Sequence, residues 1–208
     1  MSSEFEARGI GLWRGDRCLC RELSFDLGSG TILQLAGPNG VGKTSLIRTL
    51  AGIGRLDEGK VLWNGEDARR SAAYLSELIY IGHHNGLKAH LTPEENYAFY
   101  RTIAHRPTEV SAEQALMRCG IAGFKDRPVA LLSMGQKRRA ALARLLAARA
   151  RLWLLDEPLA SLDNDGVELV AGLLKTHVSA GGMAILVTHQ PIAIAGVKLR
   201  QLELGQTA

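Results

Sequence analysis

The chain has 208 residues, of which 46% are hydrophobic, 22% charged and 5% aromatic, and its formal net charge is +4. This composition is typical of one globular domain that can bury a substantial core. The weak basic excess is far below the dense basic stripe of a nucleic-acid binder, so we expect no nucleic acid among the partners.

The start of the chain shows no basic segment followed by an apolar run, so no signal peptide is expected. No stretch of about 18 apolar residues is present that could cross a bilayer. Short apolar runs instead predict strands at residues 31–36, 60–63, 78–81, 152–155 and 183–188. Helices are predicted to begin near Lys43, Pro93, Ser111, Ser133 and Asp165.

Strands that are separated by helices indicate an α/β fold with a largely parallel sheet. Between about 85 and 150 the pattern is helical, with no convincing strand. We therefore expect a single domain, 1–208, in which core segments 1–84 and 151–208 enclose a helical subdomain at about 85–150.

Three cysteines, Cys18, Cys20 and Cys119, are poorly spaced for a disulfide framework or a structural zinc site. Their number and spacing favour a reduced, cytosolic setting. Cys18 and Cys20 could contact a metal or a haem, but two alternate positions on an early strand explain them more simply.

The first motif with a chemical meaning follows the predicted strand 31–36 and fits the pattern GxxxxGK[ST] of a phosphate loop. It consists of Gly37, Pro38, Asn39, Gly40, Val41, Gly42, Lys43 and Thr44. The glycines let backbone N–H groups point at phosphate oxygens beside a helix N-terminus. Lys43 would reach the β- and γ-phosphates, and the Thr44 hydroxyl would hold Mg²⁺.

A second motif, LWLLDE, places two carboxylates directly after a buried strand at residues 152–155. Asp156 would reach Mg²⁺, which prefers oxygen ligands. Glu157 would polarise an attacking water beside the γ-phosphate. Such a pair is often structural when it stands alone, but a preceding phosphate loop favours a role in nucleotide chemistry.

A third motif, LSMGQ, begins another helix. Ser133 and Gln136 form a capping box, Gly135 lets a ligand approach the backbone, and the basic run 137–139 adds positive charge. An ordinary capped surface helix explains this motif equally well, because the chain repeats the box at 111–114. His189 follows the strand 183–188, where a lone histidine is usually structural.

The ordered set GPNGVGKT, LSMGQ, LWLLDEP, SLD and TH, spanning 37–189, closely resembles the nucleotide-binding subunits of ATP-binding cassette (ABC) transporters. The resemblance implies a P-loop NTPase of the ABC type, with a mostly parallel sheet and a helical subdomain. It also implies a head-to-tail pair of copies that encloses two ATP molecules. Each signature segment, LSMGQ, would then face the nucleotide of the other copy.

Roles carried over from this family concern ATP, Mg²⁺ and the second copy. ATP phosphates and Mg²⁺ would be bound by the phosphate loop together with Ser45, and Mg²⁺ by Thr44 and Asp156. Lys43, Glu157 and His189 would be catalytic, with Glu157 as the base and His189 at the γ-phosphate. Ser133, Gly135 and Gln136 would meet the nucleotide of the other copy, and Asp163 would organise the seam between them.

Adenine in this family usually stacks on an aromatic residue before the phosphate loop, and Trp13 is the best-placed candidate, although it could equally be an edge-strand packing residue. Met134 replaces the usual glycine of the signature segment. His84 takes the position of a glutamine that normally contacts Mg²⁺, although imidazole is a poor ligand for that ion. His83 and His84 could instead bind a transition metal, but adjacent residues rarely face one site.

Longer segments, among them YIGHHNGLKAHLTPEENYAFY, are similar to the ATP-binding subunits of haem exporters in bacterial cytochrome c maturation. This similarity implies two copies docked on integral membrane permease subunits at the cytoplasmic face of the inner membrane, a peripheral association that depends on those partners. ATP hydrolysis would support haem export or delivery. The alternatives are an ABC transporter ATPase for another solute and a soluble ABC ATPase.

Overall fold

The computed structural model describes residues 4–69, 71–197 and 199–205. Its centre is a five-stranded parallel sheet whose strands are adjacent in the order β6-β7-β8-β3-β9. The strands are β6 (Leu78–Ile81), β7 (Leu152–Asp156), β8 (Met183–Val187), β3 (Ile32–Ala36) and β9 (Leu199–Glu203). The parallel α/β core predicted from the sequence is therefore confirmed.

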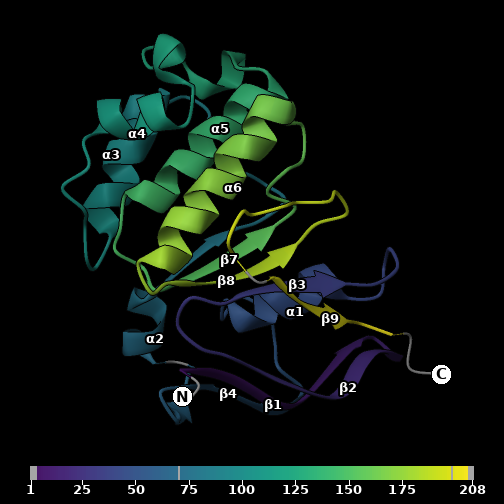
Figure 1. The fold of residues 1–208 in the computed structure, drawn as a ribbon. Coiled ribbons are helices and arrows are strands. Elements are labelled where there is room, and N and C mark those ends of the chain that lie inside the picture. The colour runs from purple at the N-terminus through teal and green to yellow at the C-terminus, as the bar shows by residue number, and fades with distance from the viewer. Residues whose placement is uncertain (1–3, 70, 198, 206–208) are drawn as a thin grey trace.

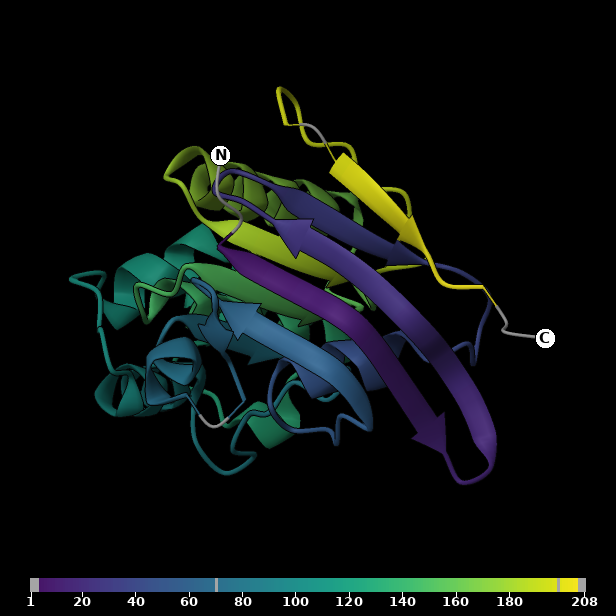
Figure 2. The ribbon, with the colours of Figure 1, turned by 90° about the horizontal axis from the view of Figure 1, so that it is seen from below.

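A second, antiparallel sheet lies below the parallel one (Figure 1). Its strands are β2 (Arg17–Leu27), β1 (Phe5–Arg14), β4 (Glu58–Trp63) and β5 (Glu66–Asp67), in that order. The predicted strand 60–63 is confirmed as part of β4, and it belongs to this antiparallel sheet. Seen from below, β1 and β2 form a long hairpin whose tip extends beyond the parallel strands (Figure 2).

Helix α1 (Lys43–Leu50) lies between the two sheets, whereas most other helices cover the opposite face of the parallel sheet (Figure 1). The α-helices that follow α1 in the chain are α2 (Ala72–Ser76), α3 (Pro93–Ile103), α4 (Ala112–Arg118), α5 (Met134–Ala143) and α6 (Asn164–Ser179). Residues 85–150 contain α3, α4, α5 and short 3₁₀ helices, with a single isolated β-bridge between Pro107 and Ala148. Among the described residues, no helix is long and apolar enough to span a bilayer.

Strand β7 shows why both faces of the parallel sheet must be covered, since all five of its residues are buried. Leu152 and Leu154 join the cluster shared with α1 and the antiparallel sheet. Trp153 and Leu155 join the cluster shared with α6 and the helical segment. Side chains alternate between the faces of a strand, so this continuous apolar run is typical of a central parallel strand. The same burial holds Asp156, the last residue of β7, at one edge of the sheet.

Candidate active site

The phosphate loop connects β3 to α1 and curves around the amino end of that helix. Gly42 caps α1 with a φ of 114°, and a Cβ at this position would lie 2.9 Å from the Leu19 side chain. The first turn of α1 contains no acidic residue and its cap makes no side-chain hydrogen bond, so its N–H groups remain available to an anion. The Lys43 ammonium donates to the carbonyl oxygens of Gly37 (2.7 Å) and Pro38 (2.9 Å), which places a positive charge on the loop.

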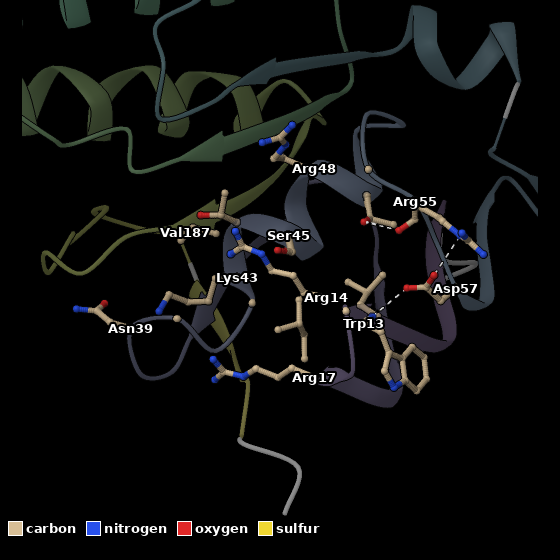
Figure 3. Close-up of a pocket in the computed structure, with 18 of the residues that line it drawn as sticks. Trp13, Arg14, Arg17, Asn39, Lys43, Ser45, Arg48, Arg55, Asp57 and Val187 are labelled. Atoms are coloured by element: carbon tan, nitrogen blue, oxygen red, sulfur yellow. Dashed lines mark hydrogen bonds and ion pairs between the residues drawn. The ribbon is translucent and has the colours of Figure 1, made fainter.

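A cavity of about 920 Å³ lies beside this loop (Figure 3). Its lining contains far more positive than negative charge, which suits a polyanion such as a nucleoside triphosphate. The cationic lining residues are Arg14, Arg17, Lys43, Arg48 and Arg55, and the carboxylates are Asp57 and Glu157. Asn39, Gly40, Gly42, Thr44, Ser45 and His189 also line it. Most of the predicted phosphate-binding residues therefore share one cavity, whereas the four arginines were not predicted.

Asp156 at the end of β7 is completely buried, although one of its two carboxylate oxygens accepts no hydrogen bond from the described residues. The Thr44 hydroxyl donates to Oδ1 at 3.2 Å, and Oδ2 has no hydrogen-bond partner among the described residues. Burial raises the pKa of Asp156 above its ordinary value, and the hydrogen bond from Thr44 partly opposes that shift. A buried carboxylate oxygen without a partner beside a hydroxyl fits a hard divalent cation, so these two side chains suit Mg²⁺.

Glu157 and His189 come together from the segments that follow two neighbouring strands, β7 and β8. The Glu157 Oε1 lies 3.4 Å from the His189 Nε2, and both side chains line the cavity. Glu157 has a φ of 53°, a conformation that costs a non-glycine residue about 1–2 kcal/mol. Its N–H donates to the Val187 carbonyl at 2.7 Å, which ties this strained residue to β8. The structure thus joins a candidate base and a candidate γ-phosphate ligand that are far apart in the sequence.

Trp13 lines the same cavity, but its ring is turned away from Lys43, whereas Arg14 and Arg17 extend toward the loop (Figure 3). The backbone N–H of Trp13 donates to the Asp57 carboxylate at 2.9 Å. A Cβ on Gly11 would lie 2.6 Å from the indole, so the ring packs against this glycine of its own strand. Stacking of adenine on Trp13 therefore stays a prediction.

The signature segment (residues 132–136) does not line this cavity among the residues that the structure describes. Ser133 and Gln136 form the predicted capping box, in which each side chain accepts from the other's N–H, at 3.2 and 2.9 Å. A Cβ on Gly135 would lie 2.8 Å from the Ser161 carbonyl oxygen, so the glycine permits close packing. Met134 is 62% exposed, so its side chain turns away from the fold.

Asp163 caps α6 by accepting from the Gly166 N–H at 2.9 Å, and it forms an ion pair with Arg139 at 2.7 Å. These two interactions lower the pKa of the exposed Asp163 carboxyl. Asp163 is likewise outside the lining of the cavity described above. Its predicted role at a seam between copies stays a prediction.

The two histidines after β6 are both exposed, with ring centroids 5.7 Å apart. The sequence placed His84 near the metal position. In the structure burial raises the pKa of Asp156 and an electrostatic contribution from His83 only partly opposes that shift, so the place of His84 near Mg²⁺ stays a prediction. No group of three or more His, Cys, Asp or Glu side chains in the described part of the chain is arranged to hold a metal ion. Cys18 and Cys20 lie on β2 as free thiols, Cys20 buried.

Arg138 was considered only as part of a basic run, yet it is 3% exposed and donates to the backbone of the catalytic edge. Its acceptors include the carbonyl oxygens of Asp156 (2.9 Å) and Glu157 (2.6 Å). The sequence does carry a signal, because Arg138 shares a helical face with Ala141, Leu142 and Leu145, all of them buried. An arginine on an apolar face indicates a buried partner.

Comparison with known proteins agrees with this site. The family model described as ABC transporter matches residues 20–160. The cytochrome c biogenesis ATP-binding export protein CcmA of Yersinia pestis is 44% identical over 203 residues, which cover 97% of this chain and 93% of the relative. The protein of the same name from Escherichia coli K12 is 44% identical over 204 residues, 97% of each chain. That from Aliivibrio fischeri is 40% identical over 202 residues, 97% of this chain and 99% of the relative.

Among solved structures, a Pyrococcus furiosus protein described as an ABC transporter ATP-binding protein has a TM-score of 0.81 at 19% identity, covering 96% of both chains, which shows the shared fold. The family model, the relatives and the cavity built on a phosphate loop lead to one conclusion. The chain belongs to the ABC transporter family, as an ATP-binding subunit that hydrolyses ATP.

Proposed function

We propose that this ABC ATPase powers haem export or delivery for cytochrome c maturation at the cytoplasmic face of the bacterial inner membrane. The observation that carries the proposal is the 44% identity over 97% of the chain with relatives named as cytochrome c biogenesis export proteins. Two copies would act together on integral membrane permease subunits. Each copy would be a single nucleotide-binding domain with the helical subdomain at about 85–150.

The residues around the cavity have separate tasks in this proposal. Asp156 and Thr44 would hold Mg²⁺, which when bound would neutralise charge on the phosphates. Lys43 and the backbone N–H groups of the phosphate loop would bind the phosphate oxygens. Glu157 would accept a proton from the attacking water, and His189 would orient that carboxylate and contact the γ-phosphate.

Closure of two copies would complete each site. Ser133, Gly135 and Gln136 remain outside the cavity of their own chain, on a helix start that is open to solvent on one side. In a head-to-tail pair this helix start would meet the phosphates of the other copy, where N–H groups and the helix dipole favour negative charge. Asp163, which is exposed, would lie at the seam.

The permease would contact a groove of about 230 Å³ between β6, α3 and the end of α5. Two large apolar side chains at this groove face solvent, Leu75 (45% exposed) and Ile103 (58% exposed). Arg144 lines the groove and donates to the Asn85 carbonyl at 2.9 Å, which connects it to the loop after β6. A helix seated here could therefore act on that loop.

The proposal is tested by trapping a tagged Glu157→Gln protein with ATP, extracting it gently from native membranes and identifying the integral membrane proteins that accompany it. Haem-handling permeases are expected. Permeases for another solute would refute the haem assignment, and the absence of any membrane partner would favour a soluble ABC ATPase. Ile103→Asp should abolish co-purification while ATP binding persists. Met117→Asp, at a 64% exposed position on α4, is the matched control and should retain the partners.

A further inference from the structure

Arg138 uses every hydrogen-bond donor of its guanidinium. Nε donates to the Pro158 carbonyl (3.2 Å), and Nη2 donates to the carbonyls of Asp156 (2.9 Å) and Glu157 (2.6 Å). Nη1 donates to the Gly82 carbonyl (3.0 Å) and to the Asn85 Oδ1 (2.9 Å). An arginine carries five N–H donors in a rigid plane, so this group is fully satisfied. Such complete pairing connects three segments, since the acceptors belong to residues 156–158 and to the loop after β6, and Arg138 itself belongs to α5.

The first of these segments holds the candidate base. The Glu157 φ of 53° is strained, and such a conformation persists only where the surroundings determine it on several sides. The Glu157 N–H is bound to the Val187 carbonyl, and the Glu157 carbonyl is bound to Arg138. Both ends of this residue's backbone are therefore held, one by β8 and the other by α5. A shift of Arg138 would move the carboxylate relative to His189.

The second segment is the loop after β6, which α5 holds at two points. Arg138 binds Gly82 and Asn85, and Arg144 binds the Asn85 carbonyl at 2.9 Å. The Arg144 guanidinium also lies 3.7 Å from the centre of the Tyr100 ring, which connects this loop to α3. His83, which acts electrostatically on Asp156, belongs to the same loop.

The third segment is α5 itself, which begins at the signature segment. Its N-cap is Ser133, and Arg138 lies on the same ten-residue helix. A rigid helix transmits a displacement of its first turn to a side chain one turn later. Burial lowers the pKa of Arg138 to about 10, and the nearby carboxylates of Asp156 and Glu157 limit this lowering. Arg138 therefore stays positively charged at neutral pH.

We propose that Arg138 is a positioning residue that couples the two ATP sites of the dimer: it transmits nucleotide contact at its own signature segment to the Glu157 of its own chain. In the proposed head-to-tail pair, on which this inference rests, that segment binds the nucleotide of the other copy. Through Arg138, the position of Glu157 in one ATP site therefore depends on whether the other ATP site holds a nucleotide. Lysine cannot replace it, because one ammonium cannot reach all the acceptors that lie around the different edges of the guanidinium plane.

The experiment uses permease complexes with two differently tagged copies of the chain, one of which carries Glu157→Gln so that a single site hydrolyses ATP. Arg138→Lys is placed either in the copy with the intact Glu157 or in the other copy. We expect turnover to fall about tenfold or more in the first arrangement, with KM for ATP within about twofold, because a displaced base affects kcat. In the second arrangement turnover should stay within about twofold of the parent complex. Arg118→Lys, at an exposed position on α4, is the matched control and should change neither value.

Coupling itself is read in complexes whose two copies both retain Glu157. There Arg138→Lys in both copies should lower the Hill coefficient for ATP toward 1. Any one of three results would overturn the inference. These are an equal loss of turnover in both single-site arrangements, a loss only in the second arrangement, and an unchanged Hill coefficient.

A second variant covers the case in which Arg138→Lys does not fold. Asn85→Ala removes one acceptor without changing α5, and it should give the same pattern with a smaller loss, about threefold. If the parent complex hydrolyses ATP normally and neither variant has an effect, this inference is refuted and the proposed function stands. If the parent complex does not hydrolyse ATP, both are refuted.

Discussion

Asp156→Asn should stabilise the nucleotide-free protein while it abolishes Mg²⁺-dependent hydrolysis. The carboxylate is completely buried, and its Oδ2 has no partner among the described residues. An unpaired buried acceptor costs about 1–3 kcal/mol, and more when it is charged. Attraction by His83, Arg138 and Arg48 offsets part of this penalty, but burial is the larger effect on the Asp156 pKa. Asparagine can still accept from Thr44, so we expect a net gain of about 1 kcal/mol in the free energy of unfolding.

The sign of the pH dependence follows from the raised pKa. The folded protein favours the protonated acid, so the ionised carboxylate weakens folding above the folded pKa. This penalty disappears as the pH falls through that value, and with it the advantage of asparagine. At neutral pH the gain corresponds to about 2–4 °C in Tm for a domain of this size.

The assay is thermal and urea unfolding of both proteins in EDTA, at neutral pH and in steps toward acid. Mg²⁺ added to ATP should raise the Tm of the wild type above its value with ATP alone, and this Mg²⁺-dependent increase should be nearly absent in the variant. Asp126→Asn, at an exposed position, is the control and should change the Tm in neither condition. A variant less stable than the wild type by more than about 1 kcal/mol, or a difference that is the same at every pH, would refute the reasoning.

Three other predictions concern single side chains. Lys43→Ala should weaken ATP binding at least about tenfold, because it removes the ammonium held on the phosphate loop; equilibrium binding with Lys175→Ala as the exposed control would check this, and unchanged affinity would count against the loop assignment. Glu157→Gln should retain ATP binding while turnover falls at least about tenfold, and wild-type turnover in a steady-state assay would exclude Glu157 as the base. His177, whose ring stacks on Trp153 at 3.8 Å, has a pKa lowered to about 4 by burial, so it destabilises the fold as the pH falls from about 6.5 toward that value. His177→Phe should reduce this acid-induced loss by up to about 3 kcal/mol in urea unfolding, and identical pH profiles would contradict the assignment.

The parallel core could be predicted because local signals and burial agree there. The strands β3, β6, β7 and β8 are short apolar runs, and Thr92, Ser111 and Ser133 cap α3, α4 and α5 as expected. The early strand that Cys18 and Cys20 indicated is confirmed as part of β2. The full length of β1 and β2 was not predicted, since shifts of register interrupt their alternation and β1 includes Gly9 with a φ of 58°. The position of β4 in the antiparallel sheet depends on pairing with β1, which a local pattern does not encode.

The candidate site was predictable where one motif carries one chemical role. Lys43, Thr44, Asp156 and Glu157 follow from the phosphate loop and the acid pair, and the structure places them at one edge of the sheet. The neighbours of these residues depend on tertiary structure instead. The apolar helical face around Arg138 indicates a buried partner, but it does not identify the carbonyl oxygens that Arg138 binds. The hairpin that carries Arg14 and Arg17 reaches the cavity only through the antiparallel sheet.

The position of β3 in the sheet has a consequence for folding during synthesis. This strand leads into the phosphate loop, yet both of its neighbours, β8 and β9, come much later in the chain, from Met183 onward. A ribosome must therefore synthesise the chain past residue 183 before β3 acquires a hydrogen-bonding partner in this sheet. Until then an apolar strand edge is exposed, so nascent chains interrupted before residue 183 should be aggregation-prone and unable to hold a nucleotide. The ATP site can thus form only long after its first motif, the phosphate loop, has been synthesised.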